Sequence, residues 1–279
     1  MMGRPSSTSM AMSRGLRRSL AGFTAVVLAI VYIPLLLVLV NSFNSDNTFG
    51  WPPPSLTLHW WKVAAESTGA REALFTSIQV ALVATTIALV LGTLAAMGLR
   101  RTRFFGRNVV SLLIILPIAL PGIVTGLAFQ NGFRTIFGIQ LSIWTIVIAH
   151  ATFCIVTVFN NVQARFQRLG TNFEQASMDL GAGRWTTFRL VTFPMLRSAL
   201  LAGGLLSFGL SFDEIVVTTF TSSPQDQTLP IWILQNLFRP NQAPIVNVVA
   251  AVLVLASAVP IYLAQRLSGS TAEGLTGAR

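Results

Sequence analysis

The sequence predicts an all-α membrane protein with six transmembrane helices. Apolar residues make up 53% of the 279 residues and charged residues only 10%, which lies outside the range of soluble globular domains. The apolar residues also gather into runs of the ~20 residues that an α-helix needs to cross a ~30 Å hydrocarbon core. The six expected spans are residues 20–40, 74–99, 109–129, 141–159, 196–217 and 246–263.

The first run follows several arginines and resembles a secretory signal in that respect. Its 21 residues exceed the ~7 to 15 of a signal peptide's apolar segment, and no small-residue cleavage pattern follows it. We therefore expect a retained helix, preceded by a disordered basic tail at residues 1–19. One transmembrane domain would then cover residues 20–266, with a second tail at residues 267–279.

The basic residues are distributed unevenly between the two sides of these spans. Of 19 lysines and arginines, 15 fall before the first run, within residues 100–108 and 160–197, or after the last run. The positive-inside rule then places both termini in the cytoplasm. A net charge of +10 can also indicate nucleic-acid binding, but no basic stripe alternates with aromatic residues. We expect membrane lipid, and no nucleic acid, as a partner.

Catalytic chemistry has no support in the sequence. The only lysine, Lys62, follows no glycine run, so the chain lacks a phosphate-binding loop, and it has no nucleophile elbow, zinc-binding histidine pair or Cys/His dyad. Cys154 lies in an apolar run, where a small buried side chain is expected and no disulfide or metal cluster can form. His150, in the same run, is expected to pack or to form hydrogen bonds, with a proton relay as the alternative. We predict a transport subunit without its own cofactor, not an enzyme.

Residues 171–194, TNFEQASMDLGAGRWTTFRLVTFP, form a polar stretch between two apolar runs. Thr171 and Glu174 have the spacing of a capping box, and Gly181 suits the left-handed residue that ends a helix. A second short helix is expected from Trp185 to just before Pro194. The first helix is too short to be stable alone, and three- and four-residue spacings give it one mostly apolar face, made of Phe173, Ala176, Ser177 and Leu180. This pair could lie on lipid headgroups or dock on a partner.

The same stretch resembles the cytoplasmic E-A-A…L-G-A…P loop of binding-protein-dependent ABC transporter permeases. The matching residues are Glu174, Ala176, Asp179, Leu180, Gly181, Ala182, Phe188, Val191 and Pro194, and the sequence departs from the pattern at Gln175, Phe193 and Arg197. In that family the loop is a coupling helix pair that docks in a groove of the ATPase. The resemblance therefore implies that Glu174, Ala176, Asp179, Leu180, Gly181 and Ala182 carry ATPase coupling.

The resemblance extends over nearly the whole chain after residue 20, through residues 77–101 and 115–129. It implies the type I ABC importer permease fold, in a bacterial plasma (inner) membrane. The implied partners are a cytoplasmic ATPase dimer that holds ATP and Mg, a second permease subunit (a paralogue or a copy), and an extracytoplasmic solute-binding protein. Residues 206–233 resemble the polyamine branch, which implies putrescine- or spermidine-like cargo.

Several residues are candidates for the solute pathway. Pro117 and Pro121 interrupt the third run and could expose carbonyls to a cavity, although an ordinary kink is the alternative. In the fifth run Ala199, Gly203, Ser207 and Ser211 form a small-residue stripe, with Glu214 expected on its side and Asp213 about 100° away. These acids could line the pathway or form an interfacial pair. Trp60 and Trp61 could attract a cation.

Two other functions stay open. A permease for another solute, such as a quaternary amine or an anion, would keep the docking loop but change the role of Asp213 and Glu214. An ATP-independent carrier or channel would need no docking loop and should carry relay residues beyond His150, Asp213 and Glu214.

Overall fold

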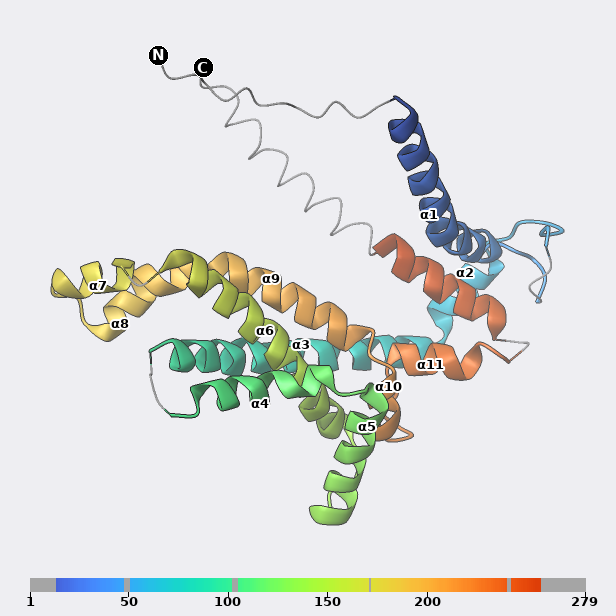
Figure 1. The fold of residues 1–279 in the computed structure, drawn as a ribbon. Coiled ribbons are helices and arrows are strands. Elements are labelled where there is room, and N and C mark those ends of the chain that lie inside the picture. The colour runs from blue at the N-terminus through green and yellow to red at the C-terminus, as the bar shows by residue number, and fades with distance from the viewer. Residues whose placement is uncertain (1–13, 48–50, 102–104, 171, 240–241, 257–279) are drawn as a thin grey trace. The chain divides into compact units, whose positions relative to one another are not determined.

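The computed structural model describes residues 14–47, 51–101, 105–170, 172–239 and 242–256 (Figure 1). Within those ranges the regular elements are helices, and the only strand-like pairing is an isolated bridge between Asn44 and Leu56. The chain divides into two compact units, one made of the residues up to Glu66 together with those from Asn236 onward, and one of Ser67–Gln235.

The first unit contains α1 (Arg14–Asn41), α2 (His59–Glu66) and an apolar helix over Ala243–Ala256. Side chains of α1 are exposed from Gly15 to Leu37, on every face of the helix. A helix that is apolar all round and unburied is typical of a membrane span. The loop between α1 and α2 is held by the Asn44–Leu56 bridge and by stacking of Phe43 on Trp61, whose ring centroids lie 5.2 Å apart.

The second unit is built around α3 (Thr68–Arg101), α6 (Ile143–Leu169) and α9 (Phe193–Phe212), which pack against one another (Figure 1). Close approach depends on small residues. A Cβ atom on Gly92 would lie 2.9 Å from the Ile155 carbonyl oxygen, so α3 and α6 could not pack this closely with a larger residue there. The other elements are α4 (Arg107–Ala119), α5 (Gly122–Asn131), η1 (Gly132–Ile136), α7 (Asn172–Asp179), α8 (Arg184–Thr187), η2 (Phe188–Thr192), α10 (Val216–Thr221) and α11 (Leu229–Asn236).

The described residues contain four or five of the six expected spans and only part of the sixth, so the count of six stays a prediction. Four helices are long and apolar enough to cross a membrane, and a fifth crossing results if the bent pair α4 and α5–η1 counts as one span. That pair bends by 102°, because Leu120 precedes Pro121 and adopts an extended backbone, as residues before proline do. The last expected span is helical over Ala243–Ala256, and residues 257–263 lie outside the described part.

The sequence predicted that the second helix of the 171–194 stretch ends before Pro194. This prediction is wrong. The helix continues from α8 through the π-helical turn η2 into α9, with a helical backbone throughout. The Phe193 N–H bonds to the Phe188 carbonyl, five residues back, so the hydrogen-bond register changes just before the proline. Pro194 has no N–H to donate. Because it lies at this change of register, the helix continues through it without losing a regular α-helical hydrogen bond there.

Candidate functional site

The loop between α6 and α9 contains the two short helices expected from its sequence. Gly181 has φ +85°, which confirms the predicted left-handed stop. The Ala182 N–H bonds to the Ser177 carbonyl at 3.1 Å and the Gly181 N–H to the Met178 carbonyl at 2.9 Å. These two bonds define a Schellman motif, which satisfies the last carbonyls of α7. Thr171 lies outside the described residues, so the capping box stays a prediction.

The orientation of α7 differs in part from the predicted apolar face. Ser177 turns inward, where its hydroxyl lies 3.1 Å from that of Thr187 in α8. Phe173, Ala176 and Leu180 are exposed, and Leu180 is 90% exposed. A helix that presents apolar side chains to solvent offers a binding surface for another protein.

Glu174 is the acid of α7 that faces back toward this chain. Its Oε1 accepts a hydrogen bond of 2.7 Å from the Thr192 hydroxyl in η2 and lies 3.5 Å from Nη1 of Arg100, at the end of α3. In the sequence, Arg100 is one of the basic residues that indicate topology, and nothing there points to a second role. No local spacing connects residue 100 to residue 174, so only the fold reveals this pair.

The predicted pathway acids lie where α9 gives way to α10. The helix ends at Phe212, with the exposed Asp213 as its last capping residue, so the run is not one helix as far as residue 217. Glu214 was expected on the same side as the small-residue stripe, but it lies beyond the end of α9 and does not extend the stripe. Its Oε1 instead accepts the Val217 N–H at 2.8 Å, which caps the first turn of α10. The stripe itself, from Ala199 to Ser211, is buried as predicted.

His150 joins this junction to α6. Its Nδ1 lies 2.8 Å from the Ser211 hydroxyl and its Nε2 2.8 Å from the Thr218 hydroxyl, and the whole side chain is buried. Thr218 donates its hydrogen to the Glu214 carbonyl at 2.8 Å, so Nε2–H donates to Thr218, and in the neutral imidazole Nδ1 then accepts from Ser211. The expected hydrogen-bonding role of His150 is confirmed. Thr218, which no sequence pattern singled out, is its second partner.

Two broken helices meet beside this junction. A Cβ atom on Gly122, which begins α5 directly after Pro121, would lie 3.2 Å from Cγ1 of Val216, which begins α10. One turn further, a Cβ atom on Gly126 would lie 2.5 Å from the Phe220 ring. The exposed Pro121 therefore adjoins the α9–α10 break, whereas Pro117 is half-buried within α4. Paired helix breaks are where transporters build solute sites.

Trp60 and Trp61 belong to α2 in the first unit, whereas Ser211, Asp213 and Glu214 belong to the second unit. The stacking of Phe43 on Trp61 also covers one face of that indole. A cation could use only its other face.

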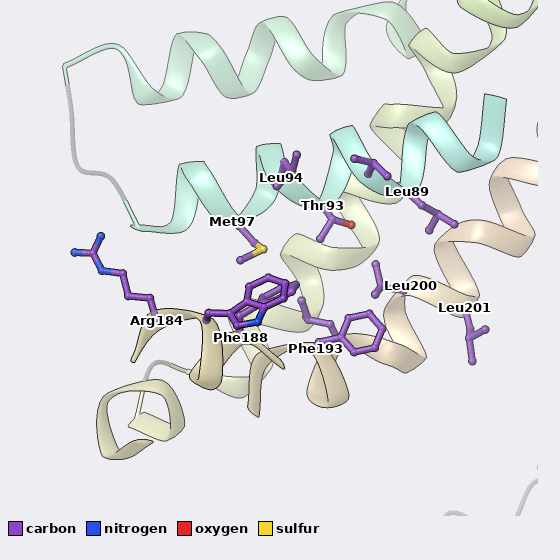
Figure 2. Close-up of a pocket in the computed structure, with 12 residues that line it drawn as sticks. Leu89, Thr93, Leu94, Met97, Arg184, Phe188, Phe193, Leu200 and Leu201 are labelled. Atoms are coloured by element: carbon purple, nitrogen blue, oxygen red, sulfur yellow. The ribbon is translucent and has the colours of Figure 1, made fainter. Parts of the chain in front are cut away.

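The second unit also contains an apolar groove of about 840 Å³ between α3 and the α8–α9 segment (Figure 2). Apolar and aromatic side chains, among them Leu94, Phe188 and Leu201, line most of it. Among the described residues that line it, Arg184 is the only charged one, so they provide none of the carboxylates that a cationic solute needs. It is distinct from the α9–α10 junction.

Relatives with curated names resemble this chain over most of its length. The spermidine/putrescine transport system permease protein PotC of Escherichia coli is 32% identical over 256 residues, 92% of this chain and 96% of that protein. The putrescine transport system permease protein PotI of E. coli is 31% identical, covering 88% of this chain and 87% of PotI. A putative 2-aminoethylphosphonate transport system permease protein, PhnV of Salmonella typhimurium, is 30% identical over 90% of this chain and 93% of its own length.

Solved structures support the fold. A chain of a bacterial ABC transporter involved in the import of the acidic polysaccharide alginate superposes with a TM-score of 0.70 at 16% identity, covering 93% of this chain and 98% of that one. An amino acid ABC transporter solved with histidines gives a TM-score of 0.56 at 19% identity, covering 76% and 99%. The family model for binding-protein-dependent transport system inner membrane components matches residues 88–271. The chain therefore belongs to this family of multi-pass inner membrane permease subunits, which are not enzymes and which rely on a separate ATPase subunit and a solute-binding protein.

Proposed function

We propose that this chain forms half of the translocation pathway of an ATP-driven importer for polyamines. The observation that carries the proposal is its 32% identity, over 92% of the chain, to a permease of a spermidine/putrescine transport system. A second permease subunit, either a paralogue or a second copy, would supply the other half. Both termini would be cytoplasmic, since the arginine-rich loops gather on their side of the predicted spans.

Within this importer, residues 171–194 would couple transport to an ATPase dimer that holds ATP and Mg. The outward-facing Phe173, Ala176 and Leu180 supply apolar area for docking, and the Gly181 turn holds α7 against α8. Glu174, Asp179 and Ala182 complete the segment whose sequence resembles the family's coupling loop. This chain would need no cofactor of its own, and the transmembrane domain would cover residues 20–266.

The polyamine would pass close to the α9–α10 junction. Asp213 is exposed there and Glu214 half-buried, so the junction offers two carboxylates within a span that carries no lysine or arginine between Ser198 and Thr221. A di- or polyammonium solute is attracted to carboxylates along its path. Ser211, Pro117 and Pro121 would line or gate the same passage, and Trp60 or Trp61 would add cation–π attraction of about 0.5 to 2 kcal/mol.

A second candidate cargo has its own support. The 30% identity to a putative 2-aminoethylphosphonate permease indicates that a closely related chain serves a solute with both an ammonium and a phosphonate group. Such a cargo would keep the docking loop and use the acids only for its ammonium end.

The deciding experiment reconstitutes the chain with its ATPase, partner permease and binding protein in vesicles. Uptake of radiolabelled putrescine, spermidine and 2-aminoethylphosphonate is then measured with and without ATP. We expect ATP-dependent polyamine uptake. Asp213→Asn combined with Glu214→Gln should weaken its apparent affinity by about tenfold or more, since two charge interactions are lost.

The control is Glu72→Gln, which removes an exposed carboxylate from the first turns of α3. Unchanged polyamine affinity and rate in an assembled double mutant would make the two acids structural. Uptake without ATP would instead identify a carrier or channel.

A further inference from the structure

Arg100 makes three contacts at the end of α3: to the last turns of α6, to the residue that ends α6, and to α7. Its Nη1 lies 3.5 Å from Glu174 Oε1 in α7, and its Nη2 donates to the carbonyl oxygen of Gly170. Its guanidinium carbon lies 4.3 Å from the ring centroid of Phe166. One planar side chain thus ties α3 to the end of α6 and to α7.

The ion pair with Glu174 and the ring contact with Phe166 are largely shielded from solvent, whereas the bond to Gly170 is exposed. The Arg100 side chain is 16% exposed and the Glu174 side chain 14%, and Phe166 belongs to the buried core formed by α3, α6 and α9. An ion pair with this degree of burial is screened less than a surface pair, and the aromatic ring beneath the guanidinium restricts its orientation. Arg100 is therefore held in place by the core and can in turn hold α7.

Glu174 accepts a second bond, from a different element. The Thr192 hydroxyl donates to the same Oε1 at 2.7 Å, and Thr192 is the last residue of η2, directly before α9. The carboxylate of Glu174 therefore lies between the end of one transmembrane helix and the start of another. Arg165 offers a comparison, since its Nε bonds to the Met195 carbonyl at 3.0 Å and so links α6 to α9.

We propose that Arg100 is a positioning residue, which with Thr192 fixes α7 relative to α3 and α9 so that movement of the docking helix is passed to the transmembrane helices. This proposal rests on the coupling role proposed for residues 171–194. Arg100 itself is not exposed enough to serve as a docking residue, and it acts through Glu174.

The test uses the full reconstituted complex and measures solute imported per ATP hydrolysed. Arg100→Gln should lower this ratio by about tenfold, as expected for the loss of a charge-assisted contact. Arg100→Lys keeps the charge but not the planar fork, and should restore part of the ratio. Arg168→Gln removes an equal charge from an exposed position at the end of α6 and should leave the ratio unchanged.

Backbone hydrogen exchange supplies a second readout. Arg100→Gln should speed exchange of the α7 amides while α6 residues 146–159 keep their protection. A general folding defect would instead speed exchange in both segments, which would contradict a positioning role. A normal ratio with normal α7 exchange in Arg100→Gln would overturn the proposal.

If Arg100→Gln does not assemble, Arg100→Lys and Thr192→Val decide. A reduced ratio with faster α7 exchange in Thr192→Val supports the proposal, and unchanged values in both variants overturn it.

Gly181→Asp distinguishes a failure of the proposed coupling role of residues 171–194 from a failure of the positioning role of Arg100. If Gly181→Asp abolishes coupling while Arg100→Gln does not affect it, the loop is the coupler and only the role of Arg100 is wrong. If Gly181→Asp transports normally, the coupling function itself is wrong.

Discussion

The loop between α6 and α9 and the junction between α9 and α10 use similar side chains in opposite surroundings. In the loop, Ser177 and Thr187 share a hydrogen bond across ten residues of sequence, next to apolar side chains that face outward. In the junction, His150 bonds to Ser211 and Thr218 across 61 and 68 residues, and all three side chains are buried. The loop exposes apolar groups, whereas the junction buries polar ones.

This difference shows what each region is able to do. Exposed apolar residues on a short helix remain available to a partner, and the helix is kept in place by its turn and by one carboxylate. Buried hydroxyl and imidazole groups must keep every hydrogen bond, because a donor left unpaired in an apolar surrounding costs roughly 1 to 3 kcal/mol. The loop is therefore suited to receive a partner, and the junction to hold two helix breaks in a fixed arrangement.

The largest effect is expected from Gly181→Asp in the loop. Its left-handed backbone disfavours any side chain by about 1 kcal/mol or more, although a Cβ atom there would meet no neighbour within 4 Å. The new residue should therefore reorient α7 without disturbing the core, and ATP hydrolysis should no longer respond to solute. The measurement is solute-stimulated ATPase activity of the assembled complex.

Gly183→Asp is the matched control. It adds the same charge two residues later, at φ −67°, where Gly183 is the N-cap of α8 and aspartate is a favoured residue. Coupling should persist in this variant. Equal loss in both variants would mean that charge, and not the turn, causes the effect.

An intermediate effect is expected from Thr218→Val in the junction. Valine has nearly the same shape but leaves His150 Nε2–H without an acceptor and the Glu214 carbonyl without this donor. The free energy of unfolding should fall by roughly 1 to 3 kcal/mol, measured as a lower unfolding midpoint of the purified protein in detergent.

Thr219→Val tests whether burial is the reason. Thr219 is exposed, and its hydroxyl donates to the Ile215 carbonyl one turn back at 2.8 Å. Its loss should change the unfolding midpoint little. A similar decrease in both variants would remove the contrast drawn between buried and exposed hydroxyls.

The smallest effect is expected from Ser177→Ala in the loop. Ser177 is half-buried, and the buried Thr187 hydroxyl that loses its partner can bond a backbone carbonyl one turn back, as helical threonines do. The free energy of unfolding should therefore fall by only about 0.5 kcal/mol. The same detergent unfolding measurement applies. A decrease as large as that of Thr218→Val would show that the loop is as tightly packed as the junction.

Short-range sequence patterns predicted much of the structure of the loop between α6 and α9. The left-handed Gly181 and the short helix before it follow from preferences that act within a few residues, and both were predicted. The inward direction of Ser177 and the continuous passage through Pro194 were not, because they depend on the register change in η2 and on where α7 packs. Periodicity likewise predicted the buried stripe of α9 but not its end at Phe212.

The sequence by itself determined the membrane class, the apolar spans and the position of the polar loop at residues 171–194, since hydropathy, length and turn chemistry are properties of contiguous residues. Only the tertiary structure decided that Arg100 and Thr192 meet on Glu174, that His150 joins Ser211 to Thr218, and that the breaks at Pro121 and Glu214 adjoin. These contacts join residues far apart in the chain. Their partners are chosen by how helices pack, which no local pattern of one sequence encodes.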